Sequence, residues 1–153
     1  MKVFILFFAI ALCATHIYSQ ENDNPEPRNN EFGIHAGTST GLGLSYRHWF
    51  NKPGLQITLL PIISDDYTFV SAALTGLYSF KETKYARVYG YLGNHIIYNS
   101  DTSDPVTYNI GLGPAFSFGS TVAFNLMFGY GMYDILNSFN LLPTIEGGLY
   151  FKF

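Results

Sequence analysis

The last ten residues of the chain, 144–153, read TIEGGLYFKF and alternate between two kinds of side chain. Successive side chains of a β-strand point to opposite faces, so every second residue shares a face. The segment therefore predicts a strand with one apolar and one mostly polar face. Phe153 ends this strand, and a terminal aromatic residue suits a strand that closes a membrane barrel, where the ring lies at the bilayer interface.

The same alternation divides the rest of the chain into strands separated by turn residues. Most have the roughly 9–11 residues that a tilted strand needs to cross a bilayer. One face is bulky and apolar and the other carries Gly, Ser, Thr and Asn, which suits a narrow barrel with lipid outside. We predict an all-β, eight-stranded antiparallel up-and-down transmembrane β-barrel over residues 31–153, with strands at 31–38, 41–50, 54–63, 67–80, 85–98, 106–118, 121–134 and 144–153.

Composition favours the same fold class. Charged residues make up 12% of the 153 residues and aromatic residues 18%, whereas ordinary globular chains carry roughly 25% charged residues. No stretch after the N-terminus approaches the ~20 apolar residues of a membrane-spanning helix. The alternative at the level of the fold is a soluble secreted β-sandwich or lipid-binding barrel.

The N-terminus has the pattern of a secretory signal peptide over residues 1–19: Lys2, an apolar run from Val3 to Ala14, then smaller residues. Cleavage is expected after Ser19 or Ala14, and the alternative is a retained membrane anchor. Residues 20–30 are polar and interrupted by proline, which predicts a flexible periplasmic lead-in. Cys13, the single cysteine, would leave with the signal, so the mature chain has no thiol and no disulfide.

Removal of residues 1–19 leaves seven basic against eleven acidic residues, a net charge of −4. This balance argues against a nucleic-acid partner.

The connections between the predicted strands alternate in length. The turns at 51–53, 81–84 and 119–120 are short, and those at 64–66, 99–105 and 135–143 are generally longer. Short turns are typical of the periplasmic end of such barrels. The apolar residues 135–136 and 139–142 are expected to fold back over the barrel mouth, or else to present a patch to a partner. Pro61 predicts an early strand end and Pro114 a bulge or local gap, because proline cannot donate to the ladder.

Charged residues on the polar face predict an internal network in the lumen. By parity the inward set comprises Glu31, Arg47, Arg87 and Lys152 near the end with the termini, and Glu146, His35 and His95 nearer the middle or the opposite end. Buried charges must pair or be solvated, and Glu31 with Arg47 is the first pair expected. Because the interior of an eight-stranded barrel is just wide enough for side chains, we predict no general pore.

Aromatic residues gather at both predicted rims, as interface-seeking rings do. The girdle nearest the termini is predicted to contain Trp49, Phe50, Tyr78, Phe80, Phe116 and Phe118.

With these features the chain resembles the small eight-stranded outer-membrane β-barrels of Gram-negative bacteria, the OmpX-like and OmpA-transmembrane-like group. Its ending, with Tyr150, Phe151 and Phe153, is similar to the signal that the outer-membrane assembly machinery reads. The resemblance implies a monomer in the bacterial outer membrane, in contact with outer-membrane lipid, lipopolysaccharide and that machinery.

The predicted function is non-enzymatic, a structural or surface-interaction role without catalytic residues, cofactor or metal. The alternatives are a lipid- or partner-binding module, and an enzyme that hydrolyses or transfers lipid A acyl chains. Such an enzyme needs a His, a Ser and an acid at the outer rim. His95, Ser100 and Asp101 are the candidates, but their spacing is unfavourable and His95 points inward. The acidic loops are interpreted as solvated tips, with a divalent-cation bridge to lipopolysaccharide phosphates as the alternative.

Overall fold

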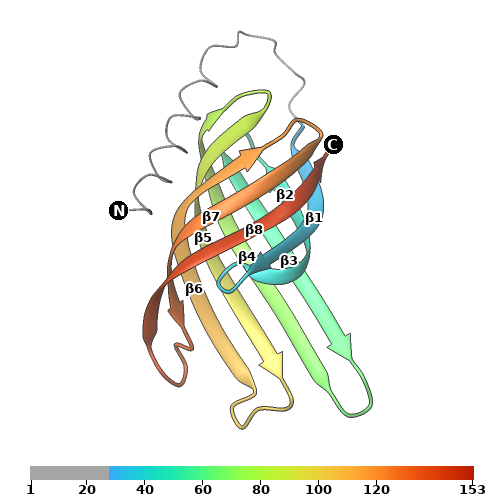
Figure 1. The fold of residues 1–153 in the computed structure, drawn as a ribbon, viewed down its shortest axis with the longest axis vertical. Helices are drawn as coiled ribbons and strands as arrows, with labels where there is room; N and C mark the ends of the chain where they lie inside the picture. The colour runs from blue at the N-terminus through green and yellow to red at the C-terminus, as the bar shows by residue number, and fades with distance from the viewer. Residues whose placement is uncertain (1–27) are drawn as a thin grey trace, which may run out of the picture.

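The computed structural model describes residues 28–153, so the predicted signal peptide and most of the predicted lead-in lie outside the described residues. Eight antiparallel strands form a closed barrel in which each pairs with its neighbours in sequence and the last pairs with the first (Figure 1). The predicted fold is confirmed. Its strands are β1 (Asn30–Gly37), β2 (Gly41–Trp49), β3 (Pro53–Ile63), β4 (Thr68–Glu82), β5 (Ala86–Asn99), β6 (Val106–Phe118), β7 (Val122–Tyr133) and β8 (Asn140–Lys152).

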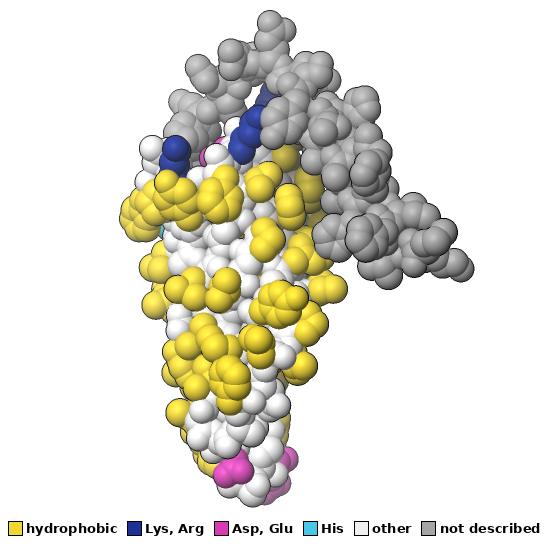
Figure 2. All heavy atoms as spheres, turned by 90° about the vertical axis from the view of Figure 1, so that its left-hand side faces the viewer, with side chains coloured by type: hydrophobic (Ala, Val, Ile, Leu, Met, Phe, Trp, Pro, Cys, Tyr) yellow, Lys and Arg dark blue, Asp and Glu magenta, His cyan; other side chains and the backbone are white. Residues whose placement is uncertain are grey.

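The barrel has polar side chains inside and apolar side chains outside. Ser45, Gln56 and Thr58 are buried in the lumen, whereas Leu44 and Ile145 on the outer face are 58% and 76% exposed. Figure 2 shows hydrophobic side chains along most of the visible face, with Lys and Arg at one end and Asp and Glu at the other. A water-soluble barrel would bury its bulky apolar groups. This wall matches a transmembrane barrel that faces lipid. Within residues 28–153, no helix is long and apolar enough to span a membrane.

The last connection differs from its prediction. Strand β8 begins at Asn140, which pairs with Tyr133 of β7, so the connection covers residues 134–139 rather than 135–143. Its apolar side chains do not fold over the mouth: Leu136, Phe139 and Leu142 are each more than half exposed. That prediction is wrong because the ladder with β7 draws residues 140–143 into the wall.

The hairpin of β1 and β2 is shorter than the other hairpins at the same end. Its strands have 8 and 9 residues, against 15 in β4, and its turn lies near mid-height of the barrel in Figure 1. The last residue of β3 paired with β2 is Leu59, and the last residue of β8 paired with β1 is Gly147. Beyond these pairs, residues 60–63 and 140–146 line an interruption of the wall, which we call the notch.

Pro61 lies on the edge of this notch. The backbone N–H of Phe50 donates to the carbonyl of Pro53, and since alternate residues of an antiparallel strand bond to alternate neighbours, odd-numbered residues of β3 face β2. Pro61 therefore faces the position where β2 is missing. The predicted early strand end is wrong, because a missing N–H interrupts no ladder at a free edge and β3 continues to Ile63.

Pro114 lies inside the wall and interrupts it. Tyr108 accepts a hydrogen bond from Ile135, which places even-numbered residues of β6 toward β7. The β6–β7 pairing stops after Leu112 and resumes at Ala115 with the same register. The predicted local gap is present, without a bulge, because Pro114 has no N–H to donate.

These two prolines make a matched pair for measuring one hydrogen bond in the wall. Replacement of either by alanine removes a restriction on the unfolded chain that is worth about 0.4–1 kcal/mol. Pro114→Ala also supplies a donor opposite β7, whereas Pro61→Ala places a donor at a free edge. We expect Pro114→Ala to be the more stable variant by about 1 kcal/mol, the net value of one hydrogen bond, in urea unfolding from lipid vesicles. Equal unfolding free energies would contradict this assignment of the gap.

Candidate functional site in the barrel lumen

A buried carboxylate, Glu31 of β1, is the centre of a charged cluster near the termini. Its Oε2 accepts a hydrogen bond from Arg47 Nη1 at 3.0 Å, and its Oε1 accepts from Arg87 Nη1 at 3.2 Å and from Trp49 Nε1 at 3.1 Å. All four side chains are at most 4% exposed. We call Glu31, Arg47, Trp49 and Arg87 the lower cluster. A buried charge is tolerated when it is paired and its remaining hydrogen-bonding groups are satisfied, and Glu31 meets both conditions.

Neighbouring strands hold the Arg47 guanidinium on its other sides. Its Nε and Nη2 donate to Gln56 Oε1 at 3.2 and 2.6 Å. Its Cζ lies 4.3 Å from the ring centroid of Tyr150 and 5.4 Å from that of Tyr89, distances at which a cation is attracted to the face of a ring. Tyr150 and Tyr89 are themselves buried. Together with Gln56, Tyr89 and Tyr150, the lower cluster therefore fills this part of the lumen with side chains from β1, β2, β3, β5 and β8.

The second buried carboxylate, Glu146 of β8, holds the turn between β1 and β2. Its Oε1 accepts from the backbone N–H and the hydroxyl of Ser39 at 2.9 and 2.6 Å, and from the Thr144 hydroxyl at 2.7 Å. Its Oε2 accepts from the Thr40 hydroxyl. Ser39 and Thr40 are fully buried. We call Glu146, Thr144 and residues 38–40 the upper cluster, in which donors from a backbone turn take the place of a cation.

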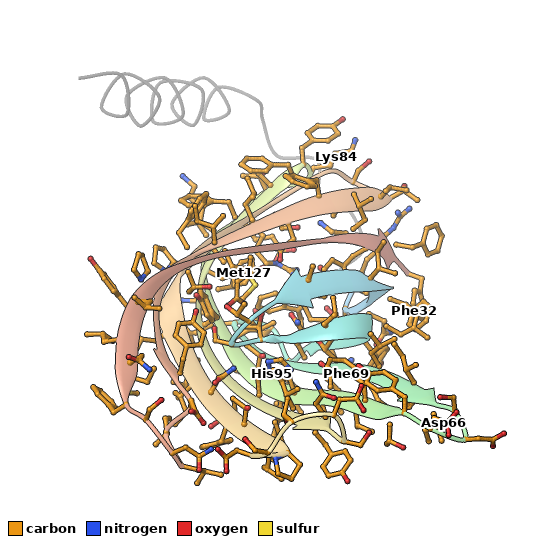
Figure 3. The ribbon with its side chains drawn as sticks, turned by 60° about the horizontal axis from the view of Figure 1, so that its bottom comes forward. Phe32, Asp66, Phe69, Lys84, His95 and Met127 are labelled. Carbon is orange, nitrogen blue, oxygen red and sulfur yellow. The ribbon has the colours of Figure 1, made fainter. Side chains whose placement is uncertain are left out.

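Two histidines complete the upper side of the lumen. His95 Nδ1 donates to the Thr38 carbonyl at 2.8 Å, and its Nε2 lies 2.8 Å from Ser71 Oγ. His35 Nε2 lies 2.6 Å from Thr40 Oγ1. Figure 3 looks toward the loop end and labels His95 near the turn of the β1–β2 hairpin, which lies across the middle of the ring of strands. Both histidines thus contact the turn and help to fix it inside the barrel.

Glycines make room for this inward turn. A Cβ at Gly93 would overlap the Ser39 carbonyl oxygen, and a Cβ at Gly111 would overlap the Ser39 hydroxyl. Gly41, which begins β2, has φ of 93°, a backbone conformation that glycine adopts without penalty. The turn can enter the lumen only because the facing strands carry no side chain there.

The structure places all seven predicted lumen residues inside the barrel but divides them. Glu31, Arg47 and Arg87 form one ion-paired group, and the predicted Glu31–Arg47 pair is present. Glu146, His35 and His95 belong to the other end. Lys152 joins neither group, because its Nζ donates to the Gly119 carbonyl at 3.0 Å near the turn between β6 and β7.

Trp49 is a correction to the predicted aromatic girdle. It is fully buried and its indole N–H is bonded to Glu31, so it does not face lipid. The alternation with a period of two already indicated an inward position, because Trp49 lies two residues after Arg47 and therefore on the same face of the strand. The other predicted girdle residues lie on the outer face near the termini: Phe50, Tyr78, Phe80, Phe116 and Phe118.

The sequence reasoning missed several lumen residues. Gln56 and Tyr89 are fully buried in the lower part of the lumen, and their parity alone would have identified them as inward. The burial of Ser39 and Thr40 had no such signal, because a short polar turn looks the same in sequence whether it lies in water or inside a barrel.

The residues considered for a lipid A-modifying enzyme do not come together. Both nitrogens of His95 are engaged in the lumen, with Thr38 and Ser71. Ser100 lies in the β5–β6 connection, where its hydroxyl accepts from the Thr68 N–H at 2.9 Å. Over residues 28–153, no group of three or more His, Cys, Asp or Glu side chains is arranged to hold a metal ion.

Comparisons with known proteins give one structural similarity to report. No family model matches the sequence, and no curated protein matches it. The barrel is similar to the crystal structure of Ail, the attachment invasion locus protein of Yersinia pestis, with a TM-score of 0.40 and 16% sequence identity, over 82% of this chain and 94% of that chain.

The lower cluster predicts that two carboxylates that pair with Arg87 contribute very different amounts to the unfolding free energy. Glu31→Ala leaves the buried Arg47 guanidinium without a carboxylate and removes one of the two carboxylates that pair with Arg87, and we expect a loss of about 3–5 kcal/mol of unfolding free energy. Glu82, whose side chain is 49% exposed, also pairs with Arg87, and Glu82→Ala should cost at most about 1 kcal/mol. Urea unfolding in vesicles measures both. A similar loss for the two variants would show that the lower cluster does not stabilise the barrel.

Proposed function

We propose that this chain is a non-enzymatic barrel of the outer membrane of a Gram-negative bacterium, with a structural or surface-interaction role and without a general pore. The observation that carries the proposal is the filled lumen. The lower cluster occupies the half near the termini, and the upper cluster occupies the middle. An interior built in this way stabilises the barrel and leaves its outer face and loops for contacts with other molecules.

The absence of a general pore rests on the side chains that meet across the lumen. Arg47 contacts groups on β1, β3 and β8, so one fully buried side chain bridges the interior. Above it, Ser39 and Thr40 are fully buried between β8 and the glycines of β5 and β6. Ions that pass along this path would have to displace a paired arginine and a hydrogen-bonded turn.

The two ends of the barrel suit different sides of an outer membrane. The short turns lie at the same end of the barrel as the start of β1 and the end of β8, as is usual for the periplasmic side, so the other loops would face outward. That outer end carries the acidic side chains Asp65, Asp66, Asp101, Asp104 and Asp134. The surface role is therefore assigned to this end.

The assembly machinery and lipopolysaccharide remain the proposed partners. Phe151 and Phe153 lie on the outer face of β8, each about half exposed, with ring centroids 6.3 Å apart. Tyr150 is turned into the lumen, where its hydroxyl lies 3.1 Å from Ser45 Oγ. The exposed part of the proposed assembly signal thus consists of the two phenylalanines, and Tyr150 belongs to the lumen packing.

Fractionation tests the proposed location. Expressed from its full chain in a Gram-negative host, the protein should be found in the outer-membrane fraction and should need detergent for extraction. An unheated sample should migrate differently from a boiled one on a denaturing gel, because the closed barrel resists the detergent. Recovery in an aqueous extract without detergent would reject the membrane assignment.

Planar-bilayer recording tests the filled lumen. The purified barrel, reconstituted from detergent, should give no discrete conductance steps, because the two clusters obstruct the path. A large porin inserted under the same conditions provides the positive control. Reproducible single-channel steps from this protein would overturn the proposal of a non-conducting barrel.

A further inference from the structure

The notch interrupts the wall on the side of β3 and β8, at the loop end. Both edges remain within the apolar belt, because the outward side chains of Leu59, Ile63, Leu141 and Ile145 are all exposed. The notch therefore opens sideways toward the part of the barrel surface that contacts lipid, rather than only upward into water.

Proline occupies both edges of the notch. Asn30 and Phe153 exchange backbone hydrogen bonds, so odd-numbered residues of β8 face β1, and Pro143 faces the position where β1 is missing. Pro61 occupies the equivalent place on β3. An exposed strand edge usually invites another strand, and each proline removes one of the donors that such a strand would need. The edges of the notch are thus poorly suited to a peptide or to a second copy of this chain.

On the side of β3, β4 and β5, the inner lining beside the notch is apolar, unlike the lower part of the lumen. Ser71 contacts His95 in the lumen, and its paired neighbours Leu60 and Ile97 therefore point inward. Ile62 pairs with Phe69, two residues from Ser71, and both share this orientation. Below the turn, the corresponding inward positions of β3 carry the polar side chains of Thr58 and Gln56. On this side, the lumen therefore changes from polar to apolar at the height where its wall opens, whereas the β8 edge of the notch carries Thr144 and Glu146 inward.

A hollow on the lipid-facing surface leads to the notch. It has a volume of about 400 Å³ and is lined by the ends of β1 and β2, by Leu60 of β3 and by residues 147–149 of β8. Ala36, Gly43 and Gly147 leave it open because they carry little or no side chain. Its lining joins the outer apolar belt to Leu60, the first inward residue of the notch.

We propose that the notch binds one acyl chain of a lipid from the surrounding leaflet, which passes through the hollow and packs against Leu60, Ile62 and Phe69. The notch is continuous with the lipid-facing belt, so acyl chains of the surrounding lipid lie beside it. Its apolar lining favours contact with an acyl chain over contact with water. The prolines disfavour a strand as the occupant. This inference rests on the proposed membrane location and names the partner of the barrel within it.

Photo-crosslinking tests whether a lipid acyl chain reaches the inward residues of the notch. The full protein is reconstituted in phosphatidylcholine vesicles that contain a phosphatidylcholine with a diazirine near the end of one acyl chain. After irradiation, mass spectrometry of peptides maps the labelled residues. We expect label on the inward residues Leu60, Ile62 and Phe69, in addition to outward residues such as Leu59. Label on outward residues alone would overturn the inference while leaving the membrane location intact, and no label at all would contradict both.

Two variants make the test specific. Ala36→Phe fills the hollow beside the notch with an outward ring and should reduce the inward label to the background of vesicles without diazirine. Gly76→Phe is the matched control, because Gly76 lines a separate hollow on the lipid-facing surface and a Cβ there meets only the Leu92 carbonyl oxygen, at an ordinary contact distance of 3.9 Å. It should leave the inward label unchanged. Heat-dependent gel mobility verifies that both variants are folded.

Persistence of the inward label in Ala36→Phe would reject the proposed route, as would an equal loss in both variants. A chemically cross-linked dimer that replaces the inward label would identify a second copy as the occupant and overturn the proposal.

Discussion

The structure depends on one constraint: backbone N–H and C=O groups that face lipid need partners within the protein, since the hydrocarbon core supplies none. The eight strands satisfy this because β1 pairs with β8 and closes the barrel, beginning with Glu31 opposite Lys152. The departures from closure follow the same constraint. Pro114 leaves a gap of two residues inside the ladder, whereas Pro61 and Pro143 face the notch, where a donor would have no strand partner. The positions of Pro61 and Pro143 therefore follow the same rule as the strand pairing, and Pro114 is the exception to it.

The lumen solves a second problem, which is how to hold carboxylates away from bulk water. Glu31 is neutralised by Arg47 and Arg87 and bonded by an indole N–H. Glu146 instead collects hydroxyl and backbone donors from a turn that has folded into the barrel. The first arrangement joins β1, β2 and β5, and the second closes the middle of the lumen and shortens the β1–β2 hairpin. The filled interior and the notch thus share a cause, because the turn that enters the lumen leaves the wall above it incomplete.

Much of the fold was predictable because a strand repeats its environment every two residues. The eight strands and the inward positions of Glu31, Arg47 and Glu146 follow from that period. Trp49 was misplaced because its residue type suggested a membrane interface, although its parity placed it in the lumen with Arg47. The end of β3 was misplaced for a different reason. Whether Pro61 disrupts a strand depends on the presence of a neighbour, and that neighbour's length is a property of the assembled sheet.

The sequence alone determined that the chain forms a barrel with apolar side chains outside and polar side chains inside. The alternation of bulky apolar and small polar residues is a local property, which does not depend on what the strands pack against. Only the tertiary structure decided how the lumen is divided, which connection enters it and where the wall opens. Those features arise from contacts between residues more than 100 positions apart, such as Ser39 with Glu146. No local pattern encodes which of several short polar turns will meet a buried carboxylate, since that depends on the barrel closing first.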